Sequence, residues 1–272
     1  MKAEFSLAHL TVLACPPAEV VYMAARAGYD YVSLRPIPMR LPGEPNWAFA
    51  TNPHLLAQTR AALAATGMRV YDIELARLTD DIEVREYLPE IEIAAEMGAR
   101  AVLTSIWTPD RATYVRKFAE LCDLAKPFGM TVDLEFVAIS PVNTLAKVVD
   151  VLGDVKRDNA GLMLDMHHFC RSGDKPEALA ALPREWFHFA HVNALYSEYP
   201  ATREEMTRMM REERLYLGEG DFDVAGVLRA IPRVVHSMEL PHGARSREWG
   251  YAEHVFRILE TAKAYFAANE LD

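Results

Sequence analysis

The sequence has few cysteines, no long apolar run and no excess of positive charge. Its three cysteines, Cys15, Cys122 and Cys170, are widely spaced and form no CxxC pair, so neither a disulfide framework nor a thiolate zinc site is indicated. No stretch reaches the roughly 18 apolar residues of a membrane span, and the amino terminus lacks a signal-peptide pattern. These features predict a cytoplasmic protein with reduced thiols and no membrane partner.

The charge balance is acidic, with 39 Asp and Glu residues against 29 Lys and Arg residues and a net charge of −10. A surface of that sign repels phosphate backbones, so nucleic acid is not the expected partner and a small-molecule substrate is. Apolar residues make up 51% of the 272 residues, which is enough for a large core. The oligomeric state stays open, a homo-oligomer included.

Short β-like runs alternate with helix-like runs about eight times along the chain. Such alternation predicts a parallel sheet with helical crossovers, and eight units predict closure into a (β/α)8 TIM barrel spanning residues 1–272 as a single domain. An open doubly wound sheet is the alternative, but the first βα turn lacks the GxGxxG of a dinucleotide fold. The expected strands are 5–12, 29–34, 69–75, 101–107, 130–137, 161–166, 187–192 and 234–240. The expected helices are 17–27, 53–66, 82–97, 110–126, 142–152, 176–182, 203–214, 224–230 and 248–268.

Ionisable side chains stand late in four successive predicted strands, at Glu135, Asp165, His191 and Glu239. Chemistry in such barrels sits at the carboxyl ends of the strands, and buried charges there are costly unless they are paired or bind a metal. Two Glu, one Asp and one His form an oxygen-rich set that suits one divalent ion, Mn²⁺, Mg²⁺, Co²⁺ or Zn²⁺. His188 is a competing candidate on the seventh strand, but it lies earlier in that strand.

These segments resemble the xylose isomerase-like TIM barrel superfamily, which includes sugar phosphate isomerases and epimerases, dehydratases and AP endonucleases of family 2. The resemblance covers essentially the whole chain. It departs from the family pattern at Arg35, where a Glu is frequent, and at Ala194, where an Asp or Asn is frequent. The matching pieces are Leu134-Glu135, Asp165-x-x-His168, the strand of His191, the segment 218–223 and Ser237-Met238-Glu239.

The resemblance implies that Glu135, Asp165, His191 and Glu239 hold the metal and that His168 contacts substrate. Glu135 and Glu239 would then be the catalytic pair on opposite sides of a metal-chelated substrate. One carboxylate would remove a proton next to a ketone, and the other would return it on the opposite face or on the neighbouring carbon. The expected activity is that of an isomerase or epimerase of a small polyhydroxy ketone or keto acid.

Further polar residues near the strand ends are expected to bind substrate. Arg35, Arg171 and Arg214 carry guanidinium forks that suit a carboxylate or a phosphate, and Glu74 comes from the third strand. If two of these arginines converge, a sugar acid, keto acid or sugar phosphate is indicated. Pairing of each arginine with nearby acids is the alternative interpretation.

Three other functions remain open from the sequence. A dehydratase of the dehydroshikimate or inosose kind would use the same scaffold and the same proton abstraction, followed by loss of a β-hydroxyl. A DNA-repair endonuclease would need more metal-binding histidines and is disfavoured by the acidic charge. A non-enzymatic binding protein is disfavoured by the complete ligand set.

Overall fold

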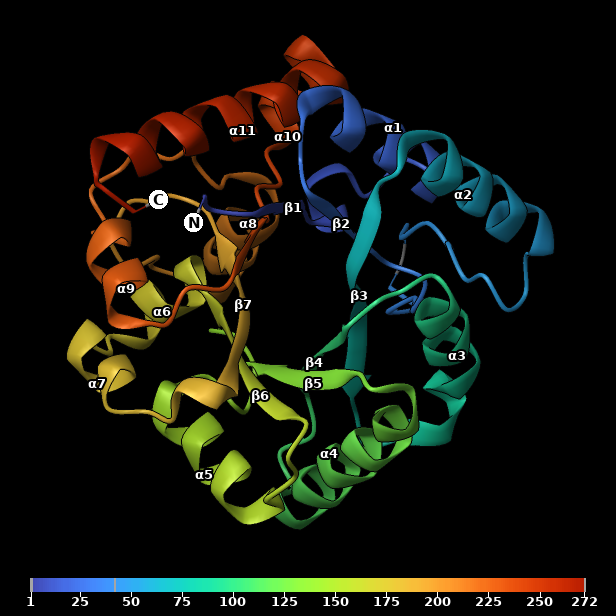
Figure 1. The fold of residues 1–272 in the computed structure, drawn as a ribbon. Helices are drawn as coiled ribbons and strands as arrows, with labels where there is room; N and C mark the ends of the chain where they lie inside the picture. Colours follow the sequence, from blue (N-terminus) through green and yellow to red (C-terminus); the bar gives the residue numbers. More distant parts are fainter. Residues whose placement is uncertain (1, 42, 272) are drawn as a thin grey trace.

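The computed structural model describes residues 2–41 and 43–271, which form a closed parallel barrel of eight strands (Figure 1). The strands pair in chain order, and β1 closes the barrel on β8. This arrangement confirms the predicted (β/α)8 TIM barrel. The strands are β1 (Phe5–Leu7), β2 (Tyr31–Leu34), β3 (Arg69–Leu78), β4 (Ala101–Ile106), β5 (Thr131–Glu135), β6 (Ala160–Asp165), β7 (Phe187–Val192) and β8 (Val235–Met238).

Helices form a ring outside the strands, and the first long helix lies beside the last where the ring closes (Figure 1). No helix among the described residues is long and apolar enough to cross a bilayer. The helices are α1 (Pro17–Ala27), α2 (Pro53–Thr66), α3 (Leu88–Glu96), α4 (Arg111–Ala125), α5 (Leu145–Val155), α6 (Met166–Ser172), α7 (Pro176–Ala180), α8 (Arg203–Glu212), α9 (Val224–Ala230), α10 (Gly243–Trp249) and α11 (Tyr251–Ala268).

Side-chain caps fix where several helices begin. Asp110 accepts a hydrogen bond from the backbone N–H of Thr113 at 2.8 Å, which confirms the cap expected for α4. Asn52 caps α2 in the same way. Such caps satisfy backbone donors that have no partner inside the helix, and they set the point at which each strand-to-helix loop ends.

Several predicted boundaries are wrong, each for a local physical reason. The first strand ends at Leu7, and the expected remainder is a 3-10 helix from His9 to Val12. Helix α5 continues past Gly153 because its apolar face extends to Val155. The closing helix is divided at Gly250, where φ is 77°, a left-handed value that breaks the helical path.

Two apolar layers hold the barrel. The larger layer lies between the strands and the surrounding helices. The smaller one is aromatic: the rings of Tyr31 and Tyr71 lie 5.3 Å apart, and those of Tyr71 and Phe189 lie 5.5 Å apart. These rings come from β2, β3 and β7 and pack against one another inside the barrel. The ring of His191 lies 5.8 Å from that of Phe189, so the aromatic layer lies next to His191. This packing leaves the carboxyl ends of the strands as the place for a site.

Candidate active site

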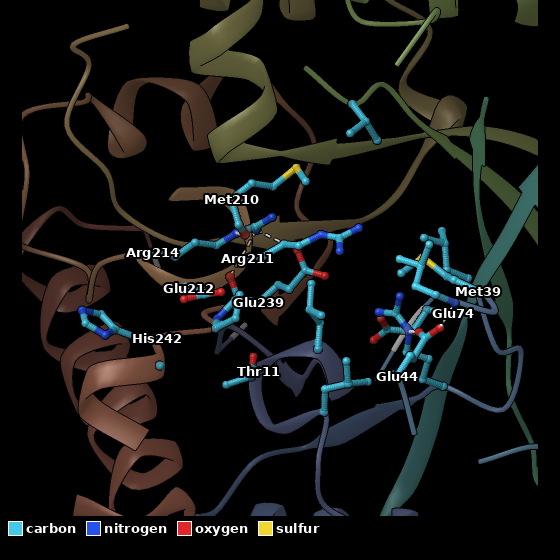
Figure 2. Close-up of a pocket in the computed structure, with 18 of the residues that line it drawn as sticks. Thr11, Met39, Glu44, Glu74, Met210, Arg211, Glu212, Arg214, Glu239 and His242 are labelled. Carbon is cyan, nitrogen blue, oxygen red and sulfur yellow. Dashed lines mark hydrogen bonds and ion pairs between the residues drawn. The ribbon is translucent and has the colours of Figure 1, made fainter. Parts of the chain in front are cut away.

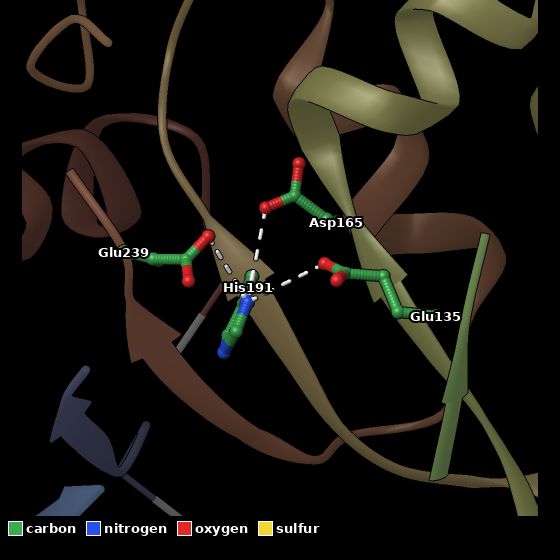
Figure 3. Close-up of side chains that lie close together, drawn as sticks. All are labelled: Glu135, Asp165, His191 and Glu239. Carbon is green, nitrogen blue, oxygen red and sulfur yellow. Dashed lines mark ion pairs between the residues drawn. The ribbon is translucent and has the colours of Figure 1, made fainter. Parts of the chain in front are cut away.

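Four side chains meet at the carboxyl end of the barrel (Figure 3). Glu135 ends β5, Asp165 ends β6, His191 lies one residue before the end of β7, and Glu239 follows β8 directly. Each residue offers one ligand atom, and these atoms all lie within 4.8 Å of one another. The structure therefore brings together the four residues that the sequence singled out.

The strand register explains this convergence. Asp165 stands directly opposite His191 in the pairing of β6 with β7, and His191 stands opposite Ser237 in the pairing of β7 with β8. Side chains alternate along a strand, so Glu239 points to the same side as Ser237, two residues earlier. In parallel strands these positions share one end of the sheet, which makes a cluster from distant parts of the chain.

Asp165 is held in place by both of its carboxylate oxygens. Oδ1 accepts a hydrogen bond from the backbone N–H of His168 at 3.0 Å and so caps helix α6. Oδ2 accepts one from Nη1 of Arg214 at 2.5 Å and lies 3.8 Å from Nδ1 of His191. In the Asp-x-x-His motif, Asp165 is thus the N-terminal cap of helix α6, and this hydrogen bond fixes the carboxylate beside the cluster.

The surroundings of the His191 ring test whether the cluster fits a metal ion. Its side chain is fully buried, yet neither ring nitrogen has a hydrogen-bond partner among the described residues. Nδ1 lies 3.3 Å from Oε2 of Glu239 and 3.8 Å from oxygens of Glu135 and Asp165. A buried imidazole without partners is costly, whereas three carboxylates and one imidazole are a donor set for Mn²⁺, Mg²⁺, Co²⁺ or Zn²⁺. The residues therefore fit one divalent metal ion.

The two glutamates sit in different electrostatic surroundings. Burial, followed by the neighbouring carboxylates of Glu239 and Asp165, raises the pKa of Glu135 to about 7. Burial acts on Glu239 in the same direction, but the charges of His191 and Arg214 outweigh it and hold the pKa of Glu239 well below its usual range. Without a metal, the cluster relies on these two cations to balance its negative charge.

A cavity of about 520 Å³ opens above the cluster (Figure 2). Glu135 and Glu239 line it, together with four of the residues predicted to bind substrate: Arg35, Glu74, His168 and Arg214. Nε2 of His168 lies 3.9 Å from Oε1 of Glu135. These placements agree with the predicted site, and the roles of the residues remain predictions.

The predicted arginines are all occupied by other protein groups. Arg35 is paired with Glu44 at 3.2 Å and with Glu74 at 3.1 Å. Nη1 of Arg214 lies 2.6 Å from Glu239. Arg171 is not among the cavity-lining residues, because its guanidinium donates to the backbone carbonyls of Tyr196, Ser197 and Glu198. Arg171 therefore fixes that loop, and its contact with substrate remains a prediction.

Sequence reasoning missed several residues of the cavity wall. Arg211, from the charged helix α8, lines the rim, and Glu44, from the long loop after β2, provides the partner of Arg35. The charged run of α8 was visible in the sequence, but which of its faces meets the barrel was not. Glu44 carried no sequence signal, since it lies in a loop without periodicity.

His188 lies away from the cluster. Its Nδ1 is 2.6 Å from Oδ1 of Asp133, a pair formed toward the amino-terminal ends of β5 and β7. Of the two histidines on the seventh strand, His191 is therefore the one that joins the three carboxylates.

Comparison with protein families assigns the chain to a family. The family model described as xylose isomerase-like TIM barrel matches residues 21–249. The chain belongs to this family. The inosose isomerase of Bacillus subtilis (strain 168) is 30% identical over 117 residues, which are 42% of this chain and 40% of that protein. The inosose isomerase of Halalkalibacterium halodurans is 41% identical over 61 residues, or 22% of either chain. The matches thus span less than half the length of these curated relatives.

Solved structures show the same fold across the full length of this xylose isomerase-like barrel. The IOLI protein with a bound zinc atom has a TM-score of 0.79 at 21% identity, covering 98% of this chain and 99% of that one. The D-allulose 3-epimerase of Methylomonas sp., in complex with D-allulose, has a TM-score of 0.70 at 20% identity, covering 97% of both chains. At these identities the likeness establishes the fold.

Proposed function

We propose that this xylose isomerase-like barrel is a divalent-metal-dependent isomerase or epimerase of a small polyhydroxy ketone or keto acid. The observation that carries the proposal is the convergence of Glu135, Asp165, His191 and Glu239 at the floor of a cavity of substrate size. The curated relatives are inosose isomerases, and structural neighbours include 3-epimerases of ketoses. Both reactions move a proton next to a carbonyl group.

The four clustered residues would hold the metal, because they offer three carboxylates and one imidazole with unpartnered ring nitrogens. When bound, a divalent ion supplies a Lewis acid that polarises a ketone oxygen and acidifies the neighbouring C–H bond. Arg214 pairs with Asp165 and Glu239 and orients both side chains, and its charge helps to hold the pKa of Glu239 below its usual range.

Glu135 and Glu239 would move the proton. They extend from β5 and β8 on opposite sides of His191, so a substrate between them has one carboxylate on each side (Figure 3). A carboxylate oxygen of one glutamate removes the proton, and the other glutamate returns a proton on the opposite face or on the neighbouring carbon. Apolar side chains, among them Leu10, Leu13 and Trp107, form part of the cavity wall and can pack against the carbon skeleton of a substrate.

The acidic surface supports a small-molecule substrate. With a net charge of −10, the chain repels a polyphosphate backbone, so nucleic acid does not form part of the proposal.

The test is solvent proton exchange. The metal-loaded protein is incubated with hexuloses and inososes in D₂O, and deuterium entry next to the carbonyl is followed by NMR. We expect exchange and product formation without loss of water, about one divalent ion per chain by metal analysis, and no turnover by Glu239→Gln. Glu204→Gln, an exposed change on α8, is the matched control and should retain full activity.

Two results would contradict the proposal. Full activity of Glu239→Gln would remove Glu239 from the mechanism. Loss of water from the substrate, seen as an unsaturated product, would replace the isomerase by a dehydratase on the same scaffold.

A further inference from the structure

The two halves of the active-site cavity differ in chemistry. The half that belongs to β5–β8 and the segments after them holds the four residues of the proposed metal site and the charged side chains of Arg211, Glu212 and Arg247. In the other half, the segments after β1, β2 and β4 contribute five side chains that form an apolar wall. These are Leu10, Leu13, Met39, Leu41 and Trp107. Figure 2 shows Met39 on the opposite side of the cavity from Arg211 and Arg214.

The apolar wall faces the cavity instead of closing over a core. Each of its five side chains is only partly buried, and all five line the same cavity. Apolar surface in contact with water is unfavourable, and a contiguous patch of it inside a cavity is typical of a site that binds an apolar group.

Hydrogen bonds and stacking hold the apolar wall in place. Nε1 of Trp47 donates to the carbonyl of Leu13 at 2.9 Å, which fixes the segment after β1. Nε1 of Trp107 donates to Oγ of Ser105 at 2.9 Å, and the guanidinium of Arg77 lies 4.2 Å from the Trp107 ring. A wall that is held before the ligand arrives loses little conformational entropy on binding.

The polar side chains on this half of the cavity contact other protein groups. Arg35 pairs with Glu44 and with Glu74, so these three charges balance within the protein. Oγ1 of Thr11 donates to a backbone carbonyl and accepts from a backbone N–H at the end of β8, both at 2.9 Å. A sugar hydroxyl placed here would leave water and would have to compete with these contacts for a partner, which is unfavourable.

The volume of the cavity indicates a ligand larger than a free monosaccharide. At about 520 Å³ it falls within the range of about 300–1,000 Å³ that is typical of sites for drug-sized ligands. A single sugar ring is smaller than such ligands. With its carbonyl end at Glu135 and Glu239, it would leave the apolar wall in contact with water.

We propose that the substrate is a keto sugar that carries an apolar aglycone. The sugar ring lies over Glu135 and Glu239, and the aglycone packs against the apolar wall, with Leu13, Met39 and Trp107 in contact with it. The proposal names the class of substrate of the same site, and it rests on the proposed function only for the carbonyl end. Aryl and alkyl aglycones share the apolar chemistry that the wall would recognise.

The test measures binding instead of turnover. Calorimetry on the metal-loaded protein compares methyl, phenyl and hexyl β-D-glucopyranoside, which share one sugar and contain no ketone. We expect the phenyl or the hexyl glucoside to bind about tenfold or more tightly than the methyl glucoside, because burial of an apolar group of that size is worth about that factor. The better ligand shows whether the aglycone is aromatic or aliphatic. Its binding should also have the more negative heat-capacity change, which marks apolar burial.

Variants locate the subsite. Leu13→Ser and Met39→Ser should each weaken the better ligand by about threefold or more and leave the methyl glucoside within about twofold. Phe256→Ser replaces an exposed apolar side chain on α11 outside the cavity wall, and it should leave all three affinities unchanged. Circular dichroism checks that each variant is folded.

The outcomes separate the two proposals. Equal affinities for the three glucosides, or no detectable binding of the phenyl and hexyl glucosides, would overturn the apolar aglycone. A preference that persists in both Leu13→Ser and Met39→Ser would do the same. A preference that depends on these residues, combined with no deuterium exchange in any ketose or inosose, would support the aglycone and contradict the isomerase. Exchange in a free ketose together with equal affinities would support the isomerase and overturn the aglycone.

Discussion

Nη1 of Arg214 lies 2.6 Å from Oε2 of Glu239, and both side chains are almost completely buried. The same nitrogen contacts Asp165, so one guanidinium balances two carboxylates of the proposed metal site. In the absence of a metal this pairing is essential, because an unpaired buried carboxylate is strongly unfavourable.

Arg214→Met is therefore expected to destabilise the metal-free protein more than the metal-loaded protein. Removing one partner of a buried pair costs about 3–5 kcal/mol, and a bound divalent ion would replace part of the lost charge. Thermal unfolding with a chelator and with excess Mn²⁺ measures both losses. The control is Arg208→Met, whose exposed pairing with Glu213 is worth about 1 kcal/mol or less. Equal losses in the two metal states would contradict the expectation.

The two histidines of β7 are expected to differ in their effect on metal affinity. His191→Ala removes a ligand and should raise the dissociation constant for Mn²⁺ by more than about 100-fold, since even the loss of an outer hydrogen-bond partner of a ligand costs 10–100-fold. His188→Ala should change it by less than about threefold, because His188 contacts Asp133 away from the cluster. Titration calorimetry gives both values. A comparable loss of Mn²⁺ affinity in the two variants would contradict the proposal that His191 is a metal ligand.

His188 should make folding stability dependent on pH. Burial lowers the pKa of His188, but the adjacent Asp133 carboxylate outweighs burial, so that the pKa lies above its usual value. A histidine with a raised pKa in the folded state stabilises the protein below the unfolded-state pKa of about 6.5, and this contribution is lost as pH rises through the folded-state pKa.

The stability advantage of the wild type over His188→Gln should accordingly shrink as pH is raised from 6. Urea unfolding at a series of pH values measures the difference in free energy of unfolding. A difference that stays constant with pH would show that the Asp133 contact is not an ion pair.

A side chain at Gly161 is expected to destabilise the protein. A Cβ at this position would collide with Oδ1 of Asp133 and would lie 2.5 Å from Nδ1 of His188. Gly161→Ala should therefore lower the free energy of unfolding by about 1–3 kcal/mol, the usual cost of overpacking. Chemical denaturation measures the change.

Gly153→Ala is the matched control. This glycine lies inside α5, and a Cβ there meets nothing within 4 Å. Alanine should stabilise the protein by about 0.5–1 kcal/mol, because it loses less backbone entropy than glycine when the helix forms. Destabilisation by both substitutions to a similar extent would show that the collision at Gly161 is not the cause.

Local patterns in the sequence were sufficient to predict the eight-stranded barrel and the bounds of several elements. The expected bounds of α2 and α9 and of β7 agree with the structure, since apolar periodicity, Pro at the helix start and Gly at the helix end act over a few residues. The expected boundaries were wrong after Leu7, where a 3-10 helix follows the strand, and at Gly250, where a positive φ divides the closing helix.

The sequence alone also determined which residues form the cluster, because carboxylates and an imidazole at the ends of successive parallel strands must share one end of a closed barrel. Only the tertiary structure decided which groups the arginines contact. Arg35 contacts Glu44 across a loop, Arg171 contacts carbonyls 25 to 27 residues away, and Arg77 stacks on Trp107, which follows β4. Those partners depend on loop paths and side-chain rotamers, which local propensity does not encode.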